Sequence, residues 1–366
     1  MLIRGAKIFC GRSFIDADIQ FDRTVTAVGS LSGPTDINAA GCYVIPGLVD
    51  IHTHGAVGVS FSDGDPAALA AAGNYYAAHG VTSFLATTLT RPEPDLIAAM
   101  HAVRAYRRQG GAKCVGVHLE GPFLSCNKRG AHNPDCLRAP DINLFDRLNA
   151  ASGGRVRLIT LACDTEGAPA LIRHAAQVCT VSLGHTNADY DTALTAYAAG
   201  ATHTTHLYNA MPPLLHRQPG VIGAALDSNA SVELICDGLH IHPAVIRATY
   251  RMFGERLILV SDSISCAGMP DGDYQLSGQS ITVTAGRALV SGTDTLAGSS
   301  ISLLDAVRNA VHFGLPLEAA VYAASAAPAR AAGLDAGILR VGGAADLVIL
   351  DQQMNPLAVF IDGEEQ

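Results

Sequence analysis

Side chains able to bind a metal ion recur at the ends of several apolar, strand-like runs. In "VIPGLVDIHTHG", Asp50, His52 and His54 occupy alternate positions, which face the same side of a strand. Comparable runs end in His118, Glu120, His185, His203, His206, His240, His242 and Asp262. One histidine at a strand end is usually structural, but six ends of this kind predict a shared metal site. Imidazole and carboxylate donors suit Zn²⁺, with Fe²⁺, Mn²⁺ or Co²⁺ as alternatives.

The elements that must position these side chains alternate between apolar runs and Ala-rich helical stretches. "DPAALAAAGNYYAAHG" precedes "VTSFLATTL", and "DYDTALTAYAAG" precedes "THTTHLYNAMP". This alternation across residues 48–337 predicts an α/β fold, a (β/α)8 TIM-like barrel, although an open doubly wound sheet would show the same order. In a barrel the carboxyl ends of all strands open on one face, so residues distant in sequence can converge there.

The two ends of the chain are instead rich in short β-type runs. "LIRGAKIFCGRSFIDADIQFDRTVTAVG" and "GILRVGGAADLVILDQQMNPLAVFIDG" both consist of apolar runs broken by turns. Because short β segments rarely fold alone, we expect residues 1–47 and 338–366 to form one small discontinuous β-sandwich subdomain.

Composition and charge exclude several classes of protein. Of the 366 residues, 49% are hydrophobic and 16% charged, which is typical of a globular protein. No apolar run is long enough to span a bilayer, and the first residues do not resemble a signal peptide. The nine cysteines form no C-x-x-C pair, and the net charge of −9 disfavours nucleic acids and membrane surfaces. We therefore expect a cytoplasmic protein.

Seven motifs, read in order, carry a resemblance to a known family. "PGLVDIHTHG" resembles the metal-dependent amidohydrolase superfamily. Together with "HLEGPFL", "KRGAHNP", "SLGHTNA", "THLYNAMPPLLHRQPG", "CDGLHIHP" and "TLAGSSISLLDAVRN", it resembles the N-acetylglucosamine-6-phosphate deacetylase family within that superfamily. The resemblance implies hydrolysis of the acetamide of N-acetyl-D-glucosamine 6-phosphate to D-glucosamine 6-phosphate and acetate.

The same resemblance implies a ligand set for one or two divalent ions. Glu120, His185 and His206 would hold the main ion and leave an open position for water. His52 and His54 would hold a second ion, with Glu120 as the bridge.

Catalytic and substrate-binding roles follow from the resemblance as well. Asp262 would act as general base and then general acid, with a helix N-cap as the alternative, and His132 would help stabilise the oxyanion. Arg217 would reach the phosphate from a neighbouring subunit, which implies a homodimer; a surface salt bridge is the alternative. The implied substrate-binding set is Ala131, His132, Asn209, Ala210, Arg217, Asp237, His240, Leu296, Ala297 and Gly298.

Departures from the family pattern leave the substrate open. "AGMPDG" also resembles N-acetylgalactosamine-6-phosphate deacetylases, whereas "YNAM" favours the glucosamine enzymes. The metal-binding pattern is also compatible with a cyclic amidase, an N-acyl amino-acid deacylase, or an inactive barrel that binds a partner. His118, His203 and His242 receive no specific role, and either support of the ligands or plain packing would explain them.

Overall fold

Eight parallel strands make up the main sheet of the computed structural model, which describes residues 1–366. Every strand pairs with its neighbours in sequence, whereas a doubly wound sheet reverses its strand order. The last strand returns to the first: the Asp262 N–H donates to the His52 carbonyl at 2.9 Å, and the His54 N–H donates to the Ser263 carbonyl at 2.7 Å. The barrel prediction is confirmed. In order, its strands are β6 (Leu48–Thr53), β9 (Val81–Thr88), β10 (Lys113–Glu120), β11 (Val156–Leu161), β12 (Thr180–Leu183), β13 (His203–Thr204), β14 (Ser231–Ile235) and β15 (Leu257–Val260).

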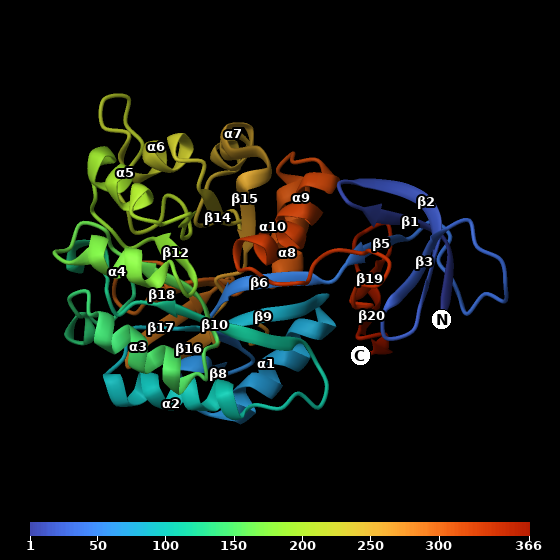
Figure 1. Ribbon diagram of the computed structural model, residues 1–366, viewed down its shortest axis with the longest axis horizontal. Helices are drawn as coiled ribbons and strands as arrows, with labels where there is room; N and C mark the ends of the chain where they lie inside the picture. The colour runs from blue at the N-terminus through green and yellow to red at the C-terminus, as the bar shows by residue number, and fades with distance from the viewer.

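Helices cover the outside of this barrel (Figure 1). Several begin at an aspartate that accepts a backbone N–H, as Asp65, Asp141 and Asp189 do. Because the strands are covered on their outer face and filled on their inner face, β6 and β9 are buried along their whole length. None of the helices is both long and apolar enough to cross a membrane. The helices are α1 (Pro66–Ala78), α2 (Glu93–Ala105), α3 (Ile142–Ala151), α4 (Ala168–Ala175), α5 (Tyr190–Ala198), α6 (Gly220–Asp227), α7 (Pro243–Phe253), α8 (Leu303–His312), α9 (Leu317–Ala324) and α10 (Ala326–Ala331).

A second sheet joins the two ends of the chain, as predicted. In Figure 1 its N-terminal and C-terminal strands lie side by side, and both termini lie in this smaller unit. The junction is β5, which pairs in parallel with β1 and antiparallel with β19. The sheet has its own core of 13 buried residues. Its strands are β1 (Leu2–Cys10), β2 (Ser13–Phe21), β3 (Val25–Gly29), β4 (Ile37–Asn38), β5 (Tyr43–Pro46), β19 (Leu347–Leu350), β20 (Pro356–Ile361) and β21 (Glu364–Glu365).

Gly47 connects this second sheet directly to the first barrel strand. A Cβ atom at Gly47 would lie 2.1 Å from the Thr82 side-chain oxygen, so no larger residue fits without displacement of β9. The backbone at the start of β6 therefore packs directly against β9, the strand beside it.

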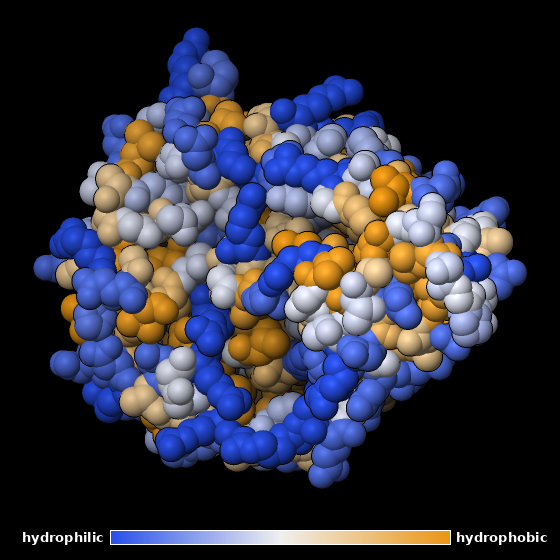
Figure 2. Space-filling model, turned by 45° about the vertical axis from the view of Figure 1, so that its right-hand side comes forward, coloured by the Kyte–Doolittle hydropathy of each residue, from blue (hydrophilic) through white to orange (hydrophobic).

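A three-stranded antiparallel sheet, which the sequence patterns did not predict, follows the last barrel strand. It comprises β16 (Gly272–Leu276), β17 (Gln279–Thr284) and β18 (Arg287–Val290). Its apolar face packs on Leu89 and Ile264, which lie beyond the carboxyl ends of β9 and β15. The insert therefore stands beside the open face of the barrel. Elsewhere the surface mixes hydrophilic and hydrophobic side chains, as the face in Figure 2 shows.

Candidate metal centre and active site

The Glu120 carboxylate lies at the centre of the predicted cluster of strand-end residues. It ends β10 and is only 2% exposed. Five imidazoles surround it, with Nε2 atoms 3.1–3.4 Å from one of its two oxygens. They belong to His52, His54, His132, His185 and His206. The predicted strand-end residues His52, His54, His185 and His206 thus converge on Glu120, and His132 joins them from the segment that follows β10.

One group within this cluster consists of Glu120, His185 and His206. Glu120 Oε1 lies 3.1 Å from His206 Nε2 and 3.2 Å from His185 Nε2, and the two nitrogens are 3.0 Å apart. Ligands bound at about 2.0–2.1 Å around a tetrahedral ion would be about 3.3–3.4 Å apart, close to these separations. His185 Nδ1 donates to the Lys128 carbonyl at 2.9 Å, which leaves the Nε2 lone pair free for a ligand. These residues fit a divalent cation.

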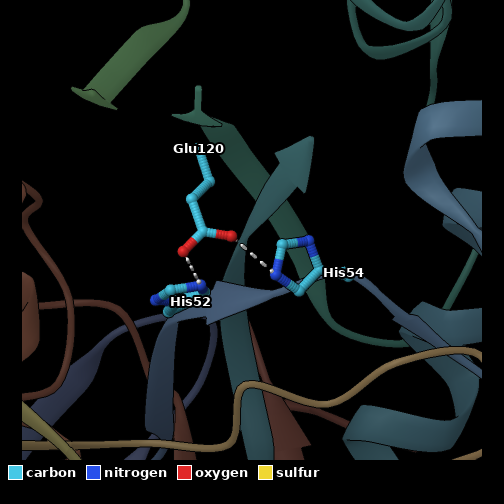
Figure 3. Close-up of side chains that lie close together, drawn as sticks. All are labelled: His52, His54 and Glu120. Atoms are coloured by element: carbon cyan, nitrogen blue, oxygen red, sulfur yellow. Dashed lines mark ion pairs between the residues drawn. The ribbon is translucent and has the colours of Figure 1, made fainter. Parts of the chain in front are cut away.

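The second group is formed by His52, His54 and Glu120, with Asp262 beside them. As Figure 3 shows, the two Glu120 oxygens face different imidazoles: Oε1 is 3.4 Å from His52 Nε2, and Oε2 is 3.2 Å from His54 Nε2. Asp262 Oδ1 lies 3.4 Å and 3.2 Å from the same two nitrogens. His52 Nε2 is buried without a hydrogen-bond partner, as is expected of a ligand atom. Glu120 therefore belongs to both groups and is placed to bridge two ions.

Both site carboxylates are held in the ionised form. Burial alone would raise the pKa of Glu120, but nearby His52 and hydrogen bonds from other imidazoles hold it well below its usual range. Burial likewise opposes ionisation of Asp262, yet the neighbouring His52 and His54 lower its pKa overall. Although burial opposes it, these carboxylates raise the pKa of His52, His54 and His206. A divalent cation that binds here would therefore displace protons from the imidazoles.

Three of these residues have backbone conformations that few side chains adopt. His185, His206 and Asp262 have φ values of 47°, 25° and 48°, and each follows a barrel strand. A residue in the left-handed region costs of order 1–3 kcal/mol and persists where the surrounding structure fixes it. The chain therefore turns sharply at these strand ends. Asp262 does not cap a helix, so that alternative is excluded.

A cavity of about 270 Å³ opens beside the metal groups. His132 lies on its wall, with Nε2 3.2 Å from Glu120 Oε2 and Nδ1 bonded to Thr90 Oγ1 at 2.9 Å. Most of the predicted substrate-binding residues line this cavity, namely Ala131, His132, Asn209, Ala210, His240, Leu296 and Gly298.

Three predicted substrate-binding residues do not line the cavity. Ala297 is fully buried, and Asp237 Oδ2 accepts from His240 Nδ1 at 2.6 Å, so Asp237 orients the imidazole that does line it. Arg217 is exposed, with Nη1 2.8 Å from His216 Nε2. Within one chain, Arg217 therefore does not reach the site.

The structure also gives places to the histidines without a role. His118 Nε2 contacts Thr160 Oγ1 at 2.7 Å inside the barrel, and His242 caps α7 by accepting the Ala244 N–H. His203 Nε2 donates to Glu233 Oε1 at 3.0 Å. Glu233 was missed because it lies within a strand, and only its charge in "SVELICDG" could have drawn attention to it.

The fold and the metal groups are those of an amidohydrolase, and the chain belongs to the amidohydrolase family. The model of that family matches residues 43–365. Among curated relatives, the N-acetylgalactosamine-6-phosphate deacetylase of Escherichia coli O157:H7 is 38% identical over 87% of this chain and 86% of its own length. The N-acetylglucosamine-6-phosphate deacetylase of Vibrio furnissii is 35% identical over 98% of this chain and 93% of its own length.

A solved structure of a related deacetylase is similar to this chain over its complete length. It is a point mutant of the N-acetyl-D-glucosamine-6-phosphate deacetylase from Mycobacterium smegmatis, in complex with N-acetyl-D-glucosamine 6-phosphate. It superposes with a TM-score of 0.96 at 38% identity and covers 100% of this chain and 98% of that one. The similarity therefore includes the terminal sheet and the barrel alike.

Proposed function

We propose that this protein hydrolyses the acetamide of N-acetyl-D-glucosamine 6-phosphate to D-glucosamine 6-phosphate and acetate. The observation that carries the proposal is the Glu120-centred cluster, with Asp262 and His132 both facing one cavity, in a chain so similar to deacetylases of this substrate. The same cluster is poorly suited to the proposal of an inactive barrel, because its ligand atoms and its acid–base candidate are all in place.

The cofactor we propose is one or two divalent cations, Zn²⁺ first, with Fe²⁺, Mn²⁺ and Co²⁺ as alternatives. Glu120, His185 and His206 would hold one, and His52, His54 and Glu120 a second. When bound, such a cation lowers the pKa of water to about 7 and polarises the substrate carbonyl.

The side chains of the cavity wall supply the rest of the chemistry. Asp262, ionised and buried, accepts the proton of the attacking water and returns it to the amine nitrogen as the C–N bond breaks. An amine is a poor leaving group unless it is protonated, so this second transfer is required. His132, which also lines the cavity, donates to the developing oxyanion.

The phosphate would be bound at the mouth of the cavity. His240 and Asn209 line it, and we propose that Arg217 comes from the partner in a homodimer, since its own chain leaves it outside. Leu214 and Leu215, on the same loop, are 43% and 48% exposed, which supports a contact surface there. The nine cysteines are all free, which supports action in the reducing cytoplasm.

Arg217→Ala is expected to raise KM for the phosphorylated sugar about tenfold or more, because a charge-assisted hydrogen bond to phosphate contributes about 1.5–3 kcal/mol. KM for the unphosphorylated sugar should change little. Steady-state kinetics on both substrates check this, with Arg173→Ala, an exposed arginine of α4, as the control. An equal effect on both sugars would reject phosphate recognition by Arg217.

The sugar epimer is the second candidate, favoured by the E. coli relative and by "AGMPDG". Amine release from both N-acetylhexosamine 6-phosphates should be compared on one purified sample of known metal content. We expect the glucosamine compound to be hydrolysed faster. Preference for the epimer would transfer the proposal to galactosamine, and turnover of neither by the metal-loaded protein would reject both.

A further inference from the structure

Glu233 is a buried carboxylate inside the barrel that contacts two of the candidate metal ligands, His52 and His206, without reaching the cavity. It lies on β14, is 0% exposed, and does not line the cavity wall. Its Oε2 is 2.8 Å from His52 Nδ1, and its Oε1 is 3.0 Å from His203 Nε2. The His206 backbone N–H also donates to Oε2, at 3.1 Å. Such a carboxylate cannot touch substrate, so its effect must pass through its neighbours.

Hydrogen-bond chemistry determines the state of His52. An ionised carboxylate only accepts, so the His52 Nδ1 facing Glu233 must carry the proton. A neutral imidazole then has its lone pair on Nε2, the atom that faces Glu120 and Asp262 at 3.4 Å. If Nδ1 lost this acceptor, no hydrogen bond on that side of the ring would favour the Nδ1–H tautomer over the Nε2–H tautomer.

We propose that Glu233 is a positioning residue that keeps His52 in its Nδ1–H tautomer, with Nε2 aimed at the second cation position formed by His52, His54 and Glu120. Occupancy of that position therefore depends on Glu233. The position formed by Glu120, His185 and His206 depends on Glu233 less, because Glu233 contacts only the His206 backbone N–H there, and His185 is oriented by the Lys128 carbonyl.

The chain of hydrogen bonds continues away from the site and makes a conservative replacement informative. His203 Nδ1 is 2.6 Å from Ser231 Oγ, and a hydroxyl either donates or accepts. A glutamine at position 233 would keep an oxygen for His52 while its amide group faced His203, whose ring would switch tautomer and donate to Ser231. Glu233→Gln should therefore preserve His52, whereas Glu233→Met, similar in length but without an acceptor, should not.

The test is titration of the metal-free protein with Co²⁺, followed by its visible spectrum and by metal analysis. We expect two ions in the unmodified protein. In Glu233→Met the affinity of the position formed by His52, His54 and Glu120 should fall by about 10–100-fold, the loss usual when the hydrogen-bond partner of a ligating histidine is removed. Glu233→Gln should bind both ions normally. Thr160→Val serves as the matched control, since Thr160 is equally buried in the barrel but contacts His118 instead.

Combining Glu233→Met with a second variant shows which of the two cation positions loses affinity. His54→Asn removes a ligand of the second group, so adding Glu233→Met there should change the affinity of the remaining ion much less than Glu233→Met alone changes the affinity of the second position. The proposal is overturned if the unmodified protein binds one ion, or if folded Glu233→Met binds two ions normally. It is also overturned if Glu233→Gln loses as much Co²⁺ affinity as Glu233→Met, or if Glu233→Met causes the same loss of affinity in the His54→Asn background.

Should Glu233→Met fail to fold, ¹⁵N-histidine NMR of the unmodified protein decides the matter. In the Zn²⁺-loaded protein the His52 ring, assigned by the loss of its signals in His52→Asn, should carry its proton on Nδ1 only, and any other protonation pattern would overturn the proposal. The inference rests on the proposed metal-dependent function, but the two fail separately. Glu233-dependent binding of two ions without amide hydrolysis would reject the function and leave the positioning role intact.

Discussion

Asp262→Asn is expected to lower kcat by roughly 10²–10⁴-fold, the contribution usual for a positioned acid–base group. Asparagine matches the shape of aspartate but cannot accept the water proton or deliver it to the amine. The Asp262 N–H donates to the His52 carbonyl, and the Ser299 N–H donates to the Asp262 carbonyl. The backbone conformation at this strand end should therefore not change in the variant. The measurement is kcat with metal content determined on the same sample.

A peripheral aspartate provides the control for this result. Asp141 caps α3 on the outside of the barrel, and Asp141→Asn should leave kcat unchanged. The assignment of Asp262 fails if its asparagine variant turns over normally while carrying a full complement of metal. If turnover and metal are lost together, Asp262 acts as a ligand and the acid–base role must be sought elsewhere.

Glu120→Ala is expected to abolish metal binding at both groups and to reduce kcat/KM by at least about a thousandfold. The single carboxylate belongs to both groups, so its removal takes one ligand from each. Loss of a cation that contributes several kcal/mol to the transition state corresponds to a decrease of this size. Metal analysis and kinetics on the same preparation check both parts.

Glu166→Ala, at an exposed glutamate on the loop before α4, is the control for Glu120→Ala and should behave as the unmodified protein. Chelation followed by dialysis should reproduce the kinetic effect in the unmodified protein, and added Zn²⁺ should reverse it. Retention of both ions by Glu120→Ala, with turnover within about tenfold, would contradict the central place given to this residue.

The residues at strand ends could be predicted from the sequence because strand geometry is regular. Alternate positions share a face, so His52 and His54 had to point the same way, and a parallel barrel had to bring Glu120 to meet them. Their observed separations follow from local periodicity and from the order of the strands. The terminal sheet was predictable for a different reason: short β segments rarely fold alone, and the two ends of the chain were the only partners available to each other.

Other features depend on contacts that periodicity does not encode. Glu233 faces the barrel interior from the middle of β14, where a single charged residue gives no spacing to read. The β16–β18 insert did have a signal, the alternating "QSITVT" before an Ala-Gly turn, but it interrupts the barrel pattern and no partner strand was evident. Arg217 lies in the loop between β13 and α6, outside any helix or strand, so periodicity does not predict where its side chain points.

The seam of the barrel has a consequence for how the protein is made. The ligands His52 and His54 end the first barrel strand, while Asp262 follows the eighth, and backbone bonds join these ends across the seam. During synthesis the first strand is complete long before the eighth exists, and β5 must wait longer still for β19. Pairings between such distant segments form slowly. The nascent chain therefore cannot assemble the complete set of site residues until the eighth strand and Asp262 have been made, although His52 and His54 are present from the start.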